Sequence, residues 1–173
     1  MPVLIQHYLR SVRINEPSLV RVVRAILSAV RESSAELAVT FVGDRRMRRL
    51  NREYRNKDCS TDVLAFAMRD APTPRASRVT PRPVGDVVIS IPTAQRQARE
   101  GGRSLDEELT VLLVHGILHL CGYDHERSER EARRMQRRER AILQRLGRRQ
   151  HRRRGTASTG SIKTTSSKSY RRQ

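Results

Sequence analysis

The fold of this chain is decided by residues 104–125, which read SLDEELTVLLVHGILHLCGYDH. Ser104 followed by Glu107 is a capping box, a pair of side chains that satisfies unpaired backbone N–H groups at the start of a helix. The strongly apolar run behind the box predicts a helix buried in the core as far as Cys121. Gly122 suits the left-handed backbone conformation that ends helices, so we expect the chain to reverse direction there.

Three histidines occupy the end of this segment, at a spacing that favours one metal site. His115 and His119 are one helical turn apart, so their rings project from the same face of the helix. The reversal expected at Gly122 would bring His125 back over the same point. Three neutral imidazoles are typical of catalytic Zn²⁺, which binds each nitrogen at about 2.0–2.1 Å and keeps one tetrahedral position open. A water in that position ionises near pH ~7, so the segment predicts a catalytic zinc centre.

Two alternatives to an open zinc site remain at this point. A histidine on an apolar helix is often an ordinary core residue, although the chain has only five histidines and three of them share this spacing. Cys121, Asp124 or Glu126 could also supply a fourth ligand and close the site. A closed site would make the metal structural rather than catalytic.

Gly116, between the first two histidines, separates this chain from the zinc proteases with the same spacing. The metzincin motif has a glutamate after its first histidine, and that glutamate is the general base for peptide hydrolysis. Gly116 has no side chain to accept a proton, so a peptidase would need a base from elsewhere in the fold. Cleavage of RNA needs that base less, because the 2′-hydroxyl is an internal nucleophile and the metal stabilises the developing charge. We therefore favour RNA over peptide as the substrate.

The rest of the chain alternates between strand and helix patterns. Strands are predicted within residues 1–9 and at Leu37–Val42, Val63–Met68 and Gly85–Ile91, with a proline-rich surface loop at Arg69–Pro83. Helices are predicted after the cap residues Asn15 and Asp44, at Pro92–Glu100, and from the capping box Ser128–Glu131 to near Gly147. This order predicts an α+β fold, in which a small mixed β-sheet of about four strands packs with helices and the three-histidine metal site lies at the end of a core helix.

Length and composition predict one domain followed by a tail. The chain has 173 residues, 3% aromatics and no Trp, so a single aliphatic core over residues 1–147 is expected. Residues 148–173 hold nine Lys or Arg, no acidic residue and almost no apolar side chain, which predicts a disordered basic tail. The tail could grip phosphates or be a dispensable solvated extension, and the sequence does not separate these two roles.

The net charge of +18 predicts a polyanionic partner, and nucleic acid is the natural one. An anionic membrane surface is the alternative, but no run of about 18 apolar residues exists and residues 1–10 lack a signal-peptide core. Cys59 and Cys121 are too few for a disulfide scaffold and fit a reducing compartment. We therefore expect a cytoplasmic protein without a membrane partner.

Residues 115–125, HGILHLCGYDH, resemble the signature H-G-x-L-H-L-x-G-Y-D-H of the YbeY endoribonucleases, which are ribosomal RNA maturation factors. Two other stretches are similar to this family, namely Asn51–Asp58 followed by Thr61–Leu64 and Phe66, and Gly85–Ser90. The resemblance covers about residues 40–147. It implies a zinc-dependent endoribonuclease, specific for single strands, that matures the 3′ end of small-subunit (16S) ribosomal RNA and takes part in ribosome quality control.

By this resemblance the functionally important arginine of the family falls on Arg55, whose planar guanidinium could hold an RNA phosphate. We therefore expect Arg55 and His115 as catalytic residues, and His115, His119 and His125 as ligands of one Zn²⁺ per chain. The partners implied are single-stranded RNA, ribosomal RNA and the small ribosomal subunit, together with ribosomal proteins or an assembly GTPase. The competing hypothesis is a ribosome-binding assembly factor whose zinc only joins the helix end to the turn.

Overall fold

The computed structural model describes residues 2–9, 12–68 and 83–157. The strands are β1 (Val3–His7), β2 (Glu36–Val42), β3 (Val63–Ala67) and β4 (Pro83–Ser90). The helices are α1 (Glu16–Ala29), α2 (Asp44–Arg55), α3 (Ile91–Glu100), α4 (Leu105–Leu120) and α5 (Glu129–Ala157). The predicted α+β class and the number of strands are confirmed.

The sheet is mixed, with the strand order β1-β2-β4-β3. β1, β2 and β4 run parallel, and β3 pairs antiparallel with β4 at the edge. Parallel neighbours need a crossover between them, and α1 provides it between β1 and β2. Because β4 pairs with β2 on one side and with β3 on the other, the last strand in sequence lies inside the sheet rather than at its edge.

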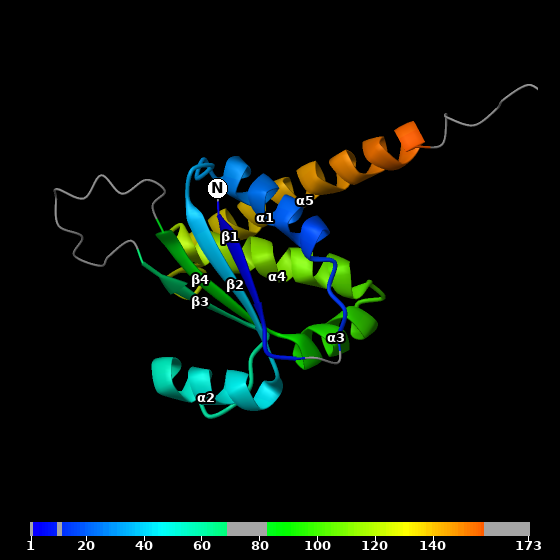
Figure 1. The fold of residues 1–173 in the computed structure, drawn as a ribbon. Helices are drawn as coiled ribbons and strands as arrows, with labels where there is room; N and C mark the ends of the chain where they lie inside the picture. Colours follow the sequence, from blue (N-terminus) through cyan, green and yellow to red (C-terminus); the bar gives the residue numbers. More distant parts are fainter. Residues whose placement is uncertain (1, 10–11, 69–82, 158–173) are drawn as a thin grey trace, which may run out of the picture.

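One face of the sheet, here called the covered face, packs against helices. α4 lies on β3 and β4, and α1 and α5 pack on α4. Figure 1 shows these three helices together on one side of the strands. Along β2 the alternate residues Leu37, Val39 and Phe41 are buried in this core, as expected for side chains that point to the same face of a strand. The core is aliphatic, as the composition predicts.

The opposite face, here called the open face, carries only α2 among the described helices. A second, smaller cluster of four buried residues, Val42, Met47, Leu64 and Val88, lies beneath this helix. In Figure 1, α2 stands apart from the other long helices, at one end of the strands. The two faces therefore differ greatly in the amount of apolar surface that they bury.

The predicted capping of α2 by Asp44 is wrong. Gly43 is the N-cap and Asp44 is the first helical residue. The Asp44 carboxylate instead accepts hydrogen bonds from the Ser90 and Thr93 hydroxyls and from the Arg96 guanidinium. Donors brought in from the start of α3 form charge-assisted bonds with the carboxylate, and these compete successfully with a cap on its own helix.

The predicted end of the last helix near Gly147 is also wrong, because α5 continues to Ala157. Arginine and glutamine beyond Gly147 are good helix formers, and each of the two interior glycines, Gly147 and Gly155, costs only about 1 kcal/mol. Residues 148–157 of the predicted disordered tail are thus helical, while 158–173 lie outside the described residues. The predicted loop at 69–82 lies outside them too, and Pro83 belongs to β4. No helix in the described part of the chain has the length and apolar content needed to cross a bilayer.

Candidate metal centre

Helix α4 and the turn after it bring the three histidines together. The Ser104–Glu107 capping box starts this helix, as predicted, and Cys121 caps its end. Gly122 adopts a positive φ of 86°, and the next amide, that of Tyr123, donates to the Leu118 carbonyl at 3.1 Å. The left-handed glycine therefore reverses the chain as predicted and returns His125 toward the helix.

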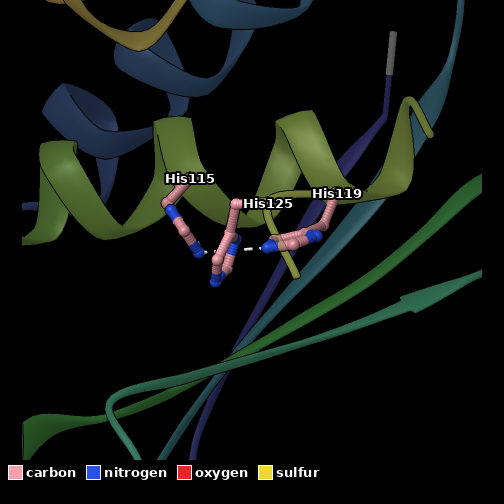
Figure 2. Close-up of side chains that lie close together, drawn as sticks. All are labelled: His115, His119 and His125. Atoms are coloured by element: carbon pink, nitrogen blue, oxygen red, sulfur yellow. Dashed lines mark hydrogen bonds between the residues drawn. The ribbon is translucent and has the colours of Figure 1, made fainter. Parts of the chain in front are cut away.

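The three rings converge on one point (Figure 2). The Nε2 atoms of His115 and His119 lie 3.1 Å apart, and ligand nitrogens of all three histidines lie within 4.8 Å of one another. Ring centroids are separated by 4.7, 5.2 and 5.0 Å for the 115–119, 115–125 and 119–125 pairs. Tetrahedral zinc with bonds of about 2.0–2.1 Å separates its ligand nitrogens by roughly 3.3 Å. The spacing of the two helical nitrogens is therefore close to what such an ion requires.

The residues considered as a fourth ligand are engaged elsewhere or exposed. Asp124 Oδ1 accepts the Glu126 backbone N–H at 2.9 Å, which shapes the turn. Cys121 is half-buried and packs against the main core. Among the described residues, the ligand group of His115, His119 and His125 has no fourth member. His125 and its neighbours Asp124 and Glu126 are exposed, whereas His115 and His119 are half-buried.

The surroundings of His119 favour a neutral ring, as metal binding requires. Burial lowers the pKa of His119 below its usual value, and the His115 and His125 rings and the Arg55 guanidinium lower it further, against an opposing effect of Asp124. A neutral ring keeps a nitrogen lone pair available for a cation. The environment of His119 therefore suits ligation at neutral pH.

A carboxylate that the sequence analysis missed contacts the cluster. Glu139 of α5 places Oε1 2.7 Å from His115 Nδ1. A sequence signal for it exists, because Glu139 falls between Met135 and Ile142 at helical spacing, and both of these are buried in the core. An acidic residue in the apolar stripe of a helix is unusual and indicates a partner in the interior.

Arg55, the other predicted catalytic residue, ends α2 on the side of the metal site. Asn56 follows it in the left-handed conformation, and the buried Asn51 donates to the Cys59 carbonyl at 2.9 Å, which ties down the loop behind the helix. The exposed Arg48 is held by Asp58 in a two-pronged ion pair. Arg55 makes no ion pair within the described ranges, and it is close enough to His119 to lower the pKa of that ring. Its guanidinium is thus available near the histidines.

A cavity of about 440 Å³ adjoins the cluster at His115. His115 and its neighbour Glu139 line this cavity, but the other two histidines do not. Three further acidic residues line it, namely Asp62, Glu100 and Glu108. Arg103 pairs with Glu108 at 2.7 Å and offsets part of this charge. His115 therefore borders an acidic cavity, while His119 is influenced by Arg55 at the end of α2.

Comparison with known proteins supports a nuclease family. The family model described as Endoribonuclease YbeY matches residues 5–147. A curated protein named Endoribonuclease YbeY from Geobacter metallireducens is 48% identical over 151 residues, which cover 85% of this chain and 99% of that protein. One of the same name from Bacillus thuringiensis is 47% identical over 119 residues, or 67% of this chain and 76% of that protein. A Thermotoga maritima protein of known solution structure shares the fold, with a TM-score of 0.59 at 20% identity over 94% of this chain and 100% of that chain.

Proposed function

The chain belongs to the YbeY endoribonuclease family, and from this premise we propose that it cleaves single-stranded RNA with a Zn²⁺ ion held by His115, His119 and His125. Endoribonuclease activity and a part in ribosomal RNA processing come with the family. We further propose maturation of the 3′ end of 16S ribosomal RNA and a role in ribosome quality control. The small ribosomal subunit, with ribosomal proteins or an assembly GTPase, is the proposed partner, and the cytoplasm is the proposed compartment.

The observation that carries this proposal is the convergence of three imidazoles without a fourth protein ligand among the described residues. When bound there, a zinc ion supplies positive charge that polarises a phosphoryl oxygen and promotes the ionisation of water. Three protein ligands without a fourth are typical of catalytic rather than structural zinc. The donor set therefore supports chemistry at the metal instead of a purely structural role.

The charge distribution around the histidines gives the RNA backbone one favourable path. The carboxylates of the adjoining cavity repel phosphates, whereas the Arg55 guanidinium on the other side attracts them. A guanidinium can bind two phosphate oxygens at once, which orients the group as well as neutralising it. We assign to Arg55 the role of holding an RNA phosphate against the metal centre. This phosphate is either the one that is cleaved or its neighbour in the chain.

Packing at Gly116 restricts how the reaction begins. A Cβ atom at this position would lie 3.0 Å from Val87 Cγ1 and 3.3 Å from Val63 Cγ2, so the position that carries the base in the metzincin motif packs against the sheet here. The nucleophile is then either the internal 2′-hydroxyl of the substrate or a water. The product ends separate these routes, because internal attack leaves a 2′,3′-cyclic phosphate and water leaves a 5′-phosphate with a 3′-hydroxyl.

The experiment that tests the proposed function combines metal analysis with cleavage of matched substrates. We expect one zinc per chain in the purified protein, cleavage of a single-stranded RNA, and little cleavage of the same sequence in a duplex. Chelation should stop the reaction and added zinc should restore it. Tight RNA binding without cleavage by the zinc-loaded protein would instead favour the assembly-factor hypothesis.

A further inference from the structure

The contact between Glu139 and His115 joins the last helix to the metal site. His115 Nδ1 and Glu139 Oε1 are 2.7 Å apart, although the two residues are 24 positions apart in the sequence. Both side chains are largely shielded, with exposed fractions of 31% for His115 and 24% for Glu139. A short contact in a half-buried setting is worth more than an ion pair between two solvated side chains, because water competes less for either partner.

We propose that Glu139 is a positioning residue of the metal centre, which accepts the Nδ1–H of His115 and holds Nε2 toward the ion. The inference rests on the proposed zinc site and adds a residue to it. A neutral imidazole has one N–H and one lone pair, so a carboxylate at Nδ1 selects the form whose lone pair is on Nε2. Nε2 is also the atom that lies 3.1 Å from His119 Nε2. In this arrangement Nδ1 of His115 donates to Glu139, and the lone pair on Nε2 is left for the zinc ion.

Helix α5 holds Glu139 in place through its apolar neighbours. Met135 and Ile142, about one turn away on either side, are buried in the main core with exposed fractions of 1% and 3%. α5 packs along α4, which carries His115. The carboxylate therefore stands on a rigid support, and the ring orientation depends on the packing of two helices instead of on α4 alone. Such supporting hydrogen bonds commonly set ligand orientation in metal sites.

A simpler explanation of the same contact is an ion pair that only fastens α5 to α4. The two explanations differ in what they predict. A fastening role lowers the stability of the metal-free protein and leaves the intrinsic zinc affinity of the folded site unchanged. A positioning role weakens zinc binding, and it does so only when His115 is present to be positioned.

The experiment measures zinc affinity by competition with a chromogenic chelator for Glu139→Ala, Glu139→Gln and the control Glu129→Ala. Glu129 lies on the same helix, carries the same charge and pairs with Arg133 on the surface, so its loss matches the change in net charge. We expect about 10–100-fold weaker binding for Glu139→Ala. Glu139→Gln should lose less, because its amide oxygen can still accept from Nδ1–H, and the control should match the parent.

Two further measurements separate orientation from stability. Glu139→Ala placed in a His115→Ala background should leave the residual zinc affinity unchanged, because the ring through which Glu139 acts is gone. Nitrogen-15 NMR of the metal-free protein, at a pH where the ring is neutral, should show His115 protonated at Nδ1 in the parent and a mixture of both forms in Glu139→Ala. Thermal unfolding of the metal-free variants reports the loss of helix fastening separately.

The outcomes also separate this inference from the proposed function. A parent protein that binds no zinc would refute the zinc site itself. A parent that binds one zinc, together with a Glu139→Ala variant of equal affinity and unchanged His115 protonation, would overturn the role of Glu139 alone. Equal losses of affinity in the presence and absence of the His115 ring would overturn it as well.

Discussion

The two faces of the sheet differ in how much packing supports the candidate functional residues that they carry. On the covered face, α1, α5 and a large aliphatic core support α4, and the three clustered histidines lie at the end of that helix and in the turn after it. On the open face, a cluster of four buried residues supports α2, whose exposed residues are mostly arginines and whose last residue is Arg55. Metal ligands must be held within a fraction of an ångström, whereas a phosphate-binding arginine works from a flexible side chain. The large core therefore lies behind the proposed metal ligands, and the small cluster lies behind the proposed phosphate-binding arginine.

The largest expected effect is on the covered face, at the metal site. His115→Ala removes one of three ligands, so we expect zinc affinity to fall until little metal stays bound through purification, and RNA cleavage to fall about 1000-fold or more. His7→Ala is the matched control, because His7 lies on β1 and pairs with Glu16 away from the cluster. Zinc content by mass spectrometry and cleavage rates on a single-stranded RNA provide the measurement. Parental cleavage by zinc-free His115→Ala would mean that the metal is not the catalyst.

Core substitutions compare the support that the two faces receive. Leu113 of α4 is fully buried on the covered face, while Leu64 of the edge strand β3 lies in the small cluster under α2. We expect Leu113→Ala to lower the free energy of unfolding by about 4–5 kcal/mol and Leu64→Ala by about 2–3 kcal/mol, because a cavity near an edge relaxes more easily. Urea unfolding monitored by circular dichroism measures both. A larger loss at Leu64 would contradict the proposed asymmetry.

A smaller effect is expected on the open face, at Arg55. Arg55→Ala should slow cleavage by about 100-fold while zinc content stays at one per chain, since the guanidinium acts on the substrate and not on the metal. Arg55→Lys should recover only part of the rate, because an ammonium lacks the planar fork. The control is Arg49→Ala, which removes an exposed arginine from the same helix. If the Arg49 variant loses as much activity as the Arg55 variant, general positive charge rather than position explains the effect.

The smallest effect concerns acid stability where α2 meets α3. Burial raises the pKa of the Asp44 carboxyl, but hydrogen bonds from Ser90, Thr93 and Arg96 outweigh it, and the pKa falls from 3.8 to about 2. Since the folded-state pKa lies below the unfolded one, the ionised carboxylate stabilises the fold above pH 3.8, and this contribution disappears as the pH falls toward 2. Asp44→Asn should be less stable than the parent at neutral pH, and the difference should shrink across this window. Urea midpoints measured against pH would show it, and a constant difference would exclude the carboxylate as its cause.

Sequence reasoning succeeded where the determining contacts are local. The helix at 104–120, its capping box and the reversal at Gly122 depend on residues at most a few positions apart, and so does the convergence of the three histidines. The assignment of Arg55 came from family resemblance, because one arginine among many has no distinguishing local pattern. The structure places it near His119 through the packing of α2 against the sheet.

Sequence reasoning failed where the contacts are distant. Asp44 matches a helix cap by its local pattern, but its actual partner Ser90 is 46 residues away. Glu139 was overlooked because His115 is 24 residues away on another helix. The insertion of β4 between β2 and β3 is likewise invisible in the sequence, since strand alternation reveals which residues share a face but not which strands pair.

The close approach at Gly116 has a consequence for protein engineering. A side chain at this position would place its Cβ 3.0 Å from Val87 Cγ1 and 3.3 Å from Val63 Cγ2, so the protease-type glutamate would need these valines to shift. We therefore expect a redesign toward a peptidase to work better when the two valines are made smaller together with the change at Gly116. Close packing at Gly116 thus disfavours the glutamate that peptide hydrolysis uses, although the histidine spacing is the same as in the zinc proteases.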